Sequence, residues 1–213
     1  MNTNHESIFS DEEKDILQEI MNIAFGNATA DLANIIDIYV VLNVPDIHVI
    51  GMGDLPRYLD ETIKLKGESS IVEQKFWGDF NGSGLLVFPD RTGKDLICVL
   101  DQNQQCTLER PLAILEQEML VEIGNILIGA CVGKVADLLD TFVTYSPPQA
   151  LTQTGESKKT LIESFDIDQS AIIMKTVFEF ENKNINGFLL IITNSESIGW
   201  LRKALHAFLE SYE

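Results

Sequence analysis

Apolar and polar residues follow a helical period in one long stretch near the start of the chain, residues 11–36. At about 100° per residue, the two kinds of side chain fall on opposite sides of a helix. The apolar side holds Leu17, Ile20, Met21, Ala24, Ala28, Leu32 and Ile35, and the polar side holds Asp15, Glu19, Asn22, Gly26, Thr29 and Ala33. The pattern predicts a helix that packs its apolar side on a sheet. Ser10 and Glu13 have the spacing of a capping box and should begin this helix.

The polar side of this predicted helix differs from an ordinary solvated surface, which usually carries long charged side chains. Two acids and an amide are followed by small residues after Asn22, so the backbone of another protein could approach closely. Phe25 lies at the edge of this side, and two interpretations stay open for it: a core residue or a contact for a partner.

The same pattern occurs a second time, 103 residues later. Asp15, Glu19, Asn22 and Gly26 are matched by Glu118, Glu122, Asn125 and Gly129. We therefore expect a second long helix over about 111–139, with Pro111 suited to its first turn. Gene duplication explains such a repeat without any function. It does not by itself explain why the acid and the amide of the outer side occur in both copies.

Each predicted long helix is followed by segments with strand character and then by a shorter helix. The expected strands are 39–42, 47–50, 62–66, 70–80 and 84–88 in the first half and 160–164, 170–181 and 187–192 in the second; the expected helices are 92–100 and 195–211. Asn81-Gly82 predicts a hairpin turn. The run that starts at Gly84 matches the run that starts at Gly187, again at an offset of 103. Pro45 and Pro148 are interpreted as structural residues between the helix layer and the sheet.

These elements predict an α+β fold built from a duplicated helix-plus-strands unit with pseudo-two-fold symmetry. The strands of both halves should form one shared, mainly antiparallel sheet with the two long helices packed on it. We expect one domain over residues 1–213, made of two repeats at about 10–102 and 110–213, with the polar residues 102–106 between them.

The charge of the chain restricts its partners. Against 33 acidic residues there are 15 basic ones, which gives a net charge of −18. Nucleic acid and anionic membrane surfaces are disfavoured, because both are bound through Lys and Arg. A partner with a basic patch or a reactive lysine fits better, and the charge would steer its approach. Solubility or a salty habitat is the alternative explanation for the acidity.

The cysteines and the apolar runs predict a cytoplasmic protein without membrane insertion. Cys98, Cys106 and Cys131 form no C-x-x-C pair, which is typical of reduced thiols in the cytosol. The polar N-terminus does not resemble a signal peptide. The longest apolar run, 188–192, is too short to cross a bilayer.

Several familiar kinds of catalytic site are missing from the sequence, including the P-loop, G-x-G-x-x-G and H-E-x-x-H. His5, His48 and His206 are scattered and predict no metal site, and Cys131 falls on the apolar side of its helix. The remaining candidates are Glu19 with Asn22 and their repeats, Glu122 with Asn125. A carboxylate can pair with a partner's cation, and an amide both donates and accepts, so it can hold a water molecule.

The spacing of these residues resembles the signature of the CheC/CheX/FliY family of chemotaxis phosphatases. That signature is Asp or Ser, three residues, Glu, two residues, Asn, twenty-two residues, Pro. The first copy matches it throughout, at Asp15, Glu19, Asn22 and Pro45. The second copy matches at Glu122, Asn125 and Pro148 but has Glu118 in place of Asp or Ser. Two motifs on one chain are most similar to CheC.

The resemblance implies a phosphatase for the aspartyl phosphate of a CheY-type response regulator. Glu19 and Glu122 would dock on the regulator's lysine, and Asn22 and Asn125 would orient the attacking water. The regulator would supply the Mg²⁺, so no cofactor is expected on this chain.

Four further residues are expected to contact the partner: Asp15 and Glu118, which begin the motifs, and Gly26 and Gly129, whose alternative role is packing within the protein. The resemblance also implies a CheD-type deamidase as a second partner. Two other functions stay open: a non-catalytic adaptor for a regulator or deamidase, and a component of the flagellar switch.

Overall fold

The structure is a computed structural model, which describes residues 9–36, 39–62, 70–88, 112–151, 170–181, 185–194 and 196–210. The described helices are α1 (Asp11–Ile36), α2 (Leu55–Thr62), α4 (Leu112–Leu138) and α6 (Glu196–Glu210), with the short 3-10 helix η1 (Met52–Asp54). The described strands are β1 (Val40–Leu42), β2 (Asp46–Gly51), β3 (Ser70–Gly78), β4 (Gly82–Phe88), β5 (Val143–Tyr145), β6 (Gln149–Leu151), β7 (Ser170–Phe180) and β8 (Ile185–Asn194).

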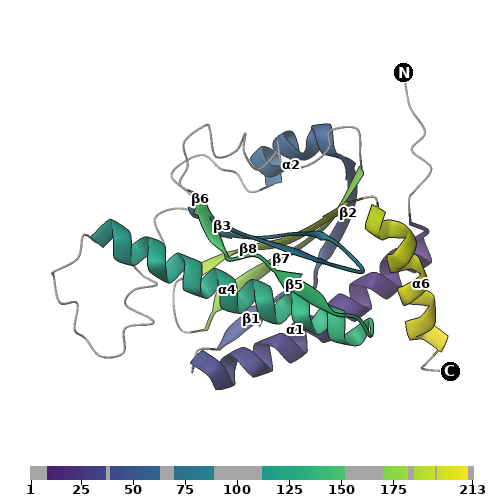
Figure 1. Ribbon diagram of the computed structural model, residues 1–213, viewed down its shortest axis with the longest axis horizontal. Coiled ribbons are helices and arrows are strands. Elements are labelled where there is room, and N and C mark those ends of the chain that lie inside the picture. The colour runs from purple at the N-terminus through teal and green to yellow at the C-terminus, as the bar shows by residue number, and fades with distance from the viewer. Residues whose placement is uncertain are drawn as a thin grey trace.

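All described strands belong to one antiparallel sheet, in the order β1-β7-β8-β4-β3-β5, with β2 also paired to β7 and β6 also paired to β3. The helices α1 and α4 cover one face of this sheet, and α2 lies over the other face (Figure 1). The α+β class and the shared antiparallel sheet that the sequence predicts are therefore confirmed.

The two halves of the chain exchange strands at the edges of the sheet. The first-half strands β1 and β2 pair with β7 of the second half, and the second-half strands β5 and β6 pair with β3 of the first half. The halves meet in the middle through β4 and β8. Because each half completes the sheet of the other, the repeats share one core.

Two contacts between equivalent residues mark the pseudo-two-fold axis. On the sheet, Leu85 pairs directly with Leu190. On the helices, the Nζ of Lys134 lies 2.7 Å from the Oδ2 of Asp31, and these two residues are 103 positions apart. The axis therefore passes through the centre of the sheet and through the contact between α1 and α4.

The predicted hairpin match of Gly84 with Gly187 is wrong by two residues. An added Cβ at Gly82 would meet the Ile192 carbonyl and the ring of Phe76. An added Cβ at Gly187 would meet the equivalent atoms of Val87 and Phe178. Gly82 and Gly187 are thus the structural counterparts, 105 positions apart, whereas Gly84 faces Ile128 of α4.

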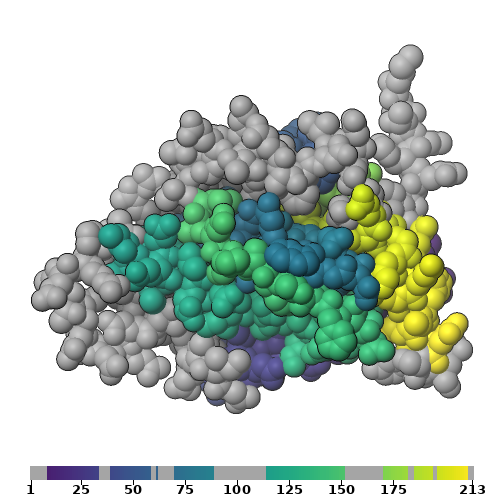
Figure 2. Space-filling view, in the orientation of Figure 1, coloured from purple at the N-terminus to yellow at the C-terminus, as the bar shows by residue number. Residues whose placement is uncertain are grey.

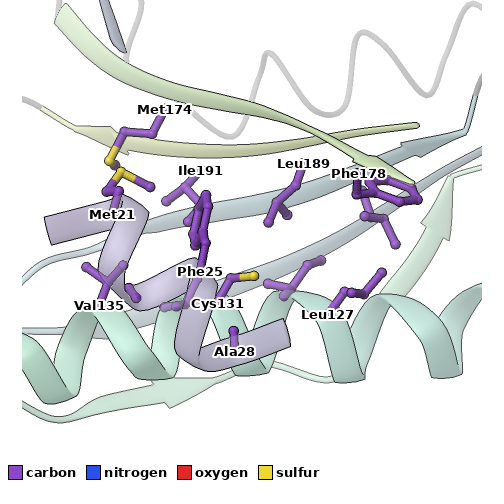
Figure 3. Packing of buried hydrophobic residues seen from close by; sticks show 14 of the residues in the cluster. Met21, Phe25, Ala28, Leu127, Cys131, Val135, Met174, Phe178, Leu189 and Ile191 are labelled. Carbon is purple, nitrogen blue, oxygen red and sulfur yellow. The ribbon is translucent and has the colours of Figure 1, made fainter. Parts of the chain in front are cut away.

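The main core lies between the sheet and the two long helices. The predicted apolar side of α1 is buried: Leu17, Ile20, Met21, Ala24, Ala28 and Leu32 have no exposed surface. Figure 3 shows Phe25 and Cys131 among these core residues, and they are 2% and 0% exposed. Phe25 is therefore a core residue. A second, smaller core on the other face of the sheet includes Met52 and Leu55.

The secondary-structure predictions were correct for the long elements and incomplete for the short ones. Both long helices, both hairpins, the strands predicted at 39–42 and 47–50, and the last helix are confirmed within a few residues. The helix α2 and the three-residue strands β5 and β6 were not predicted. Thr62, the expected start of a strand, ends α2 instead. The remaining residues of that predicted strand, 63–66, lie outside the described residues, as do the predicted strand 160–164, the predicted helix 92–100 and the connector 102–106.

By length and composition α4 could cross a membrane, over the window Ile114–Leu138. No single apolar run in the sequence indicated this. Half of the positions in that window are buried within the protein. Leu127, Cys131 and Val135 pack in the main core, as Figure 3 shows. Packing in the main core thus accounts for the buried half of these positions.

The capping box at the start of α1 is formed as predicted. The Glu13 N–H donates to Ser10 Oγ at 3.0 Å, and the Ser10 N–H donates to Glu13 Oε2 at 2.8 Å. The other carboxylate oxygen of Glu13 lies 3.0 Å from Nε of Arg202 on α6. Burial of the Glu13 carboxylate opposes its ionisation, but together the Ser10 N–H and Arg202 hold its pKa below the ordinary value.

The variant Glu13→Gln should therefore alter stability in a pH-dependent way. A lowered folded-state pKa stabilises the fold above the ordinary pKa of the carboxyl, and this stabilisation is lost as the pH falls through the lowered value. At neutral pH we expect the variant to be less stable than wild type by about 1 kcal/mol, mainly through the lost ion pair. Urea unfolding across the acid range should show the two proteins converging as the pH falls. A constant difference at all pH values would contradict this role of the charge.

Candidate functional site

The first motif lies on the side of α1 that faces away from the sheet. Asp15, Glu19 and Asn22 are all exposed. Among the described residues, none forms a hydrogen bond or ion pair with the side chain of Glu19 or Asn22. One turn of helix separates these two residues, so a carboxylate and an amide stand side by side and open to a partner.

The second motif is likewise at the surface, on α4, with Glu118, Glu122 and Asn125 exposed. The amide of Asn125 is not free, however. Its Oδ1 accepts a hydrogen bond of 2.9 Å from Nε2 of Gln74, which lies on β3 beneath the helix. The same Nε2 also donates to the backbone carbonyl of Ser146 at 3.1 Å. The sequence analysis missed Gln74.

The position equivalent to Gln74 in the other half is occupied by Thr176 of β7. Thr176 Oγ1 donates to the carbonyl of Asn43, as Gln74 donates to the carbonyl of Ser146. The surrounding backbone hydrogen bonds also correspond. The Asn43 N–H donates to the Val177 carbonyl, and the Ser146 N–H donates to the Lys75 carbonyl. Thr176 makes no hydrogen bond to Asn22, so the motif amide is held in the second site and unrestrained in the first.

Each predicted motif is followed one turn later by a glycine that the fold itself does not require. A Cβ added to Gly26 or to Gly129 would meet no described atom within 4 Å. Gly26 is exposed and Gly129 is half-buried, beside Tyr145, whose hydroxyl donates to the Gly129 carbonyl at 3.4 Å. No described atom thus gives either glycine a role in packing, and contact with a partner stays a prediction.

The hydroxyl of Tyr145 remains a neutral donor beside the second site. Burial and the nearby Asp137 carboxylate raise the pKa of Tyr145 to about 12. Burial likewise raises the pKa of the Cys131 thiol. Neither group is therefore suited to act as a base or nucleophile at neutral pH.

The two motif surfaces are separate. Asp31 and Lys134, where the helices meet, each lie nine residues after the motif asparagine of their own helix. At 1.5 Å per residue, this places each asparagine about 14 Å along its helix from the contact. Figure 2 shows α4 (teal) at the surface beside β5 and β6 (green), while α1 (purple) emerges at the lower edge of the view. Each motif can therefore meet a partner of its own.

The chemistry available at each surface is limited to docking and orienting. In the ranges that the structure describes, no three His, Cys, Asp or Glu side chains lie together in a way that could hold a metal ion. An exposed carboxylate and an amide are weak nucleophiles, but together they can bind a cation and position a water molecule. Such a surface can assist a reaction whose reactive group belongs to another molecule.

No protein-family model matches the chain. The CheY-P phosphatase CheC of Bacillus subtilis (strain 168) is 25% identical over 218 residues, covering 95% of this chain and 100% of that protein. FliY of Thermotoga maritima has a similar fold, with a TM-score of 0.68 and 18% identity over 94% of this chain and 98% of that one. The chain is therefore similar to the CheC/CheX/FliY family of chemotaxis proteins, in sequence to CheC and in fold to FliY. The middle domain of FliM from H. pylori also shares the fold (TM-score 0.60, 10% identity, 92% of this chain and 99% of that one).

The resemblance to this family that the motif spacing predicted is thus confirmed, and it extends over almost the whole chain. Both CheC/CheX/FliY motifs fall on exposed helix faces at equivalent places of the fold. The roles of the individual motif residues stay predictions.

Proposed function

We propose that this protein hydrolyses the aspartyl phosphate of a CheY-type response regulator. The observation that supports it best is the pair of Glu-x-x-Asn motifs, one on each long helix, exposed on a chain similar to CheC over 95% of its length. The net charge of −18 favours a partner with a cationic docking site. Such regulators are cytoplasmic, so we place the protein in the cytoplasm.

In this proposal Glu19 or Glu122 pairs with the lysine of the regulator's active site. Asn22 or Asn125 then enters that site and holds a water molecule in line with the phosphorus. The water oxygen forms the new bond to phosphorus, the bond to the aspartyl oxygen breaks, and inorganic phosphate leaves. The regulator contributes the Mg²⁺ and the phosphorylated aspartate. The protein lowers the barrier by positioning the water and excluding bulk solvent.

The test of this proposal is the lifetime of the aspartyl phosphate. A CheY-type regulator is phosphorylated with a small phosphodonor, and the release of phosphate is followed with and without the protein. We expect the protein to shorten the lifetime at substoichiometric amounts, because it turns over. A regulator that binds but keeps its ordinary lifetime would contradict the phosphatase function.

The small residue after each motif offers a second test, through Gly26→Gln. Because a side chain at Gly26 meets only open space, we expect the helix to gain about 0.5–1 kcal/mol in stability. The long side chain should nevertheless obstruct the regulator, raising the KM of the first site about tenfold. The measurement is made with Asn125→Ala present, so that the first site alone is assayed.

Gly199→Gln is the matched control for this substitution. Gly199 is also an exposed helical glycine with open space around it, but it lies on α6 and belongs to neither motif helix. Because Gly199 is part of neither motif helix, it should give the same gain in stability with no change in KM. Equal KM values for the two variants would show that Gly26 does not contact the regulator.

A non-catalytic role in binding is the second candidate, and the likeness to FliM favours it. The fold is shared with the FliM middle domain, and FliM of H. pylori forms a complex with FliG. An adaptor for the flagellar switch, a regulator or a CheD-type deamidase would use the same fold without hydrolysis. Capture of rotor proteins by this chain from cells that lack the regulator's kinase would support the switch role. Binding only to the phosphorylated regulator would oppose it.

A further inference from the structure

We propose that Gln74 is a positioning residue that fixes the amide of Asn125, so that the two motif sites differ in their readiness for catalysis. The proposal rests on the phosphatase function and adds to it a residue outside both motifs. Gln74 lies in the middle of β3, on the face that α4 covers, and is only 3% exposed. From there its side chain reaches Asn125 through the hydrogen bond of 2.9 Å.

The orientation of the Asn125 amide follows from the second contact of Gln74. The Ser146 carbonyl can only accept a hydrogen bond, so the atom that faces it must be the Nε2 of Gln74. The same nitrogen faces Asn125, which must therefore present its Oδ1 to the sheet. This leaves the Nδ2 group of Asn125, and one lone pair of its Oδ1, for a water molecule.

The packing under the two helices explains why only one site has this contact. Gly124, next to Asn125, lies so close to the sheet that a Cβ would meet Cγ1 of Val72 at 2.4 Å. The corresponding place in the first site is filled by Met21 and Met174, which Figure 3 shows side by side. The second site thus combines a close approach of helix and sheet with a long amide side chain.

Retention of a polar residue at this position is costly for the core. The Oε1 of Gln74 is buried and has no hydrogen-bond partner among the described residues. An apolar residue would avoid an unsatisfied buried oxygen. Positioning of Asn125 gives a reason for glutamine at this place in a strand that otherwise buries Val72 and Phe76 on the same face.

The variant Gln74→Thr isolates the contact. Threonine is the residue at the equivalent position 176, where its hydroxyl bonds the edge carbonyl. The variant should keep the bond to Ser146 and lose the bond to Asn125. With Asn22→Ala present, so that the second site alone acts, we expect kcat to fall about three- to tenfold, the equivalent of one hydrogen bond, with KM unchanged. With Asn125→Ala present, Gln74→Thr should leave the kcat of the first site unaltered.

A measurement that does not depend on activity separates this inference from the proposed function. Side-chain amide NMR should show the Asn125 NH₂ group ordered in the wild type and the Asn22 NH₂ group mobile. In Gln74→Thr, Asn125 should become as mobile as Asn22. Gln74→Met, of similar volume, should have the same effects and serves if the threonine variant does not fold.

An unchanged kcat in Gln74→Thr, or a mobile Asn125 amide in the wild type, would overturn the positioning role. A different result would refute the proposed function and leave the contact established. In that case neither the wild type nor any variant would show phosphatase activity, but the Asn125 amide would be ordered in the wild type and mobile in Gln74→Thr.

Discussion

Replacing both motif asparagines, in Asn22→Ala with Asn125→Ala, should reduce the acceleration of regulator dephosphorylation about 100-fold or more. Removal of a single group that positions or stabilises the reacting atoms typically costs two to three orders of magnitude, roughly 3–4 kcal/mol of barrier. The two asparagines are exposed and lie outside the core, so the fold should survive. Single-turnover release of phosphate from the phosphorylated regulator measures the effect.

The matched control for the double variant is Asn27→Ala. Asn27 is an exposed asparagine of the same helix, but it points away from the motif face. It should leave the rate unchanged, and alanine should slightly favour the helix. Each single motif variant should retain the activity of the other site, because the two surfaces are separate. If the double variant accelerated dephosphorylation as well as Asn27→Ala does, the catalytic assignment of both asparagines would be wrong.

The architecture was predictable from the sequence wherever periodicity extends over several turns. The buried side of α1 was correct at each predicted apolar residue from Leu17 to Leu32, because a 26-residue helix gives many repeats of one pattern. The exchange of strands between the halves was not predictable, since alternation along a strand does not identify its neighbour. The strands β5 and β6 have three residues each, too few to show a period.

The predicted match between the two hairpins was wrong for a different reason. The offset between equivalent residues is 103 on the helices, but it is 105 for Gly82 and Gly187. A constant offset assumes loops of equal length in both halves. The conflict of each glycine with a phenylalanine ring on the adjacent strand becomes visible only in three dimensions.

The candidate site was predictable on the helices and not beneath them. A helical wheel places Glu19 and Asn22 on one exposed face, and the structure agrees. Gln74 belongs to a different element, 51 residues before Asn125, and no local pattern connects the two. The available signal was a glutamine at a position where the alternation of β3 calls for a core residue. That signal indicates a buried polar contact but does not identify its partner.

Phe25→Ala should destabilise the protein by about 3–5 kcal/mol, the cost of removing a fully buried aromatic side chain. Phe25 is adjacent to the motif face in sequence, and the sequence left open whether it meets a partner. Its exposed fraction is 2%, and it lies between the sheet and α4 in Figure 3. A large cavity should form there, because Ala28 and Cys131 nearby are too small to fill it. Denaturant unfolding measures the loss.

Phe142→Ala provides the comparison, because Phe142 is 92% exposed. Truncation of an exposed side chain should change the stability by less than about 0.5 kcal/mol. The KM for the phosphorylated regulator also tests the role of Phe25. At a temperature where the Phe25→Ala variant remains folded, the KM of this variant should equal that of the wild type. A raised KM with undiminished stability would instead make Phe25 part of the docking surface, and would require α1 to expose a face that the structure buries against the sheet.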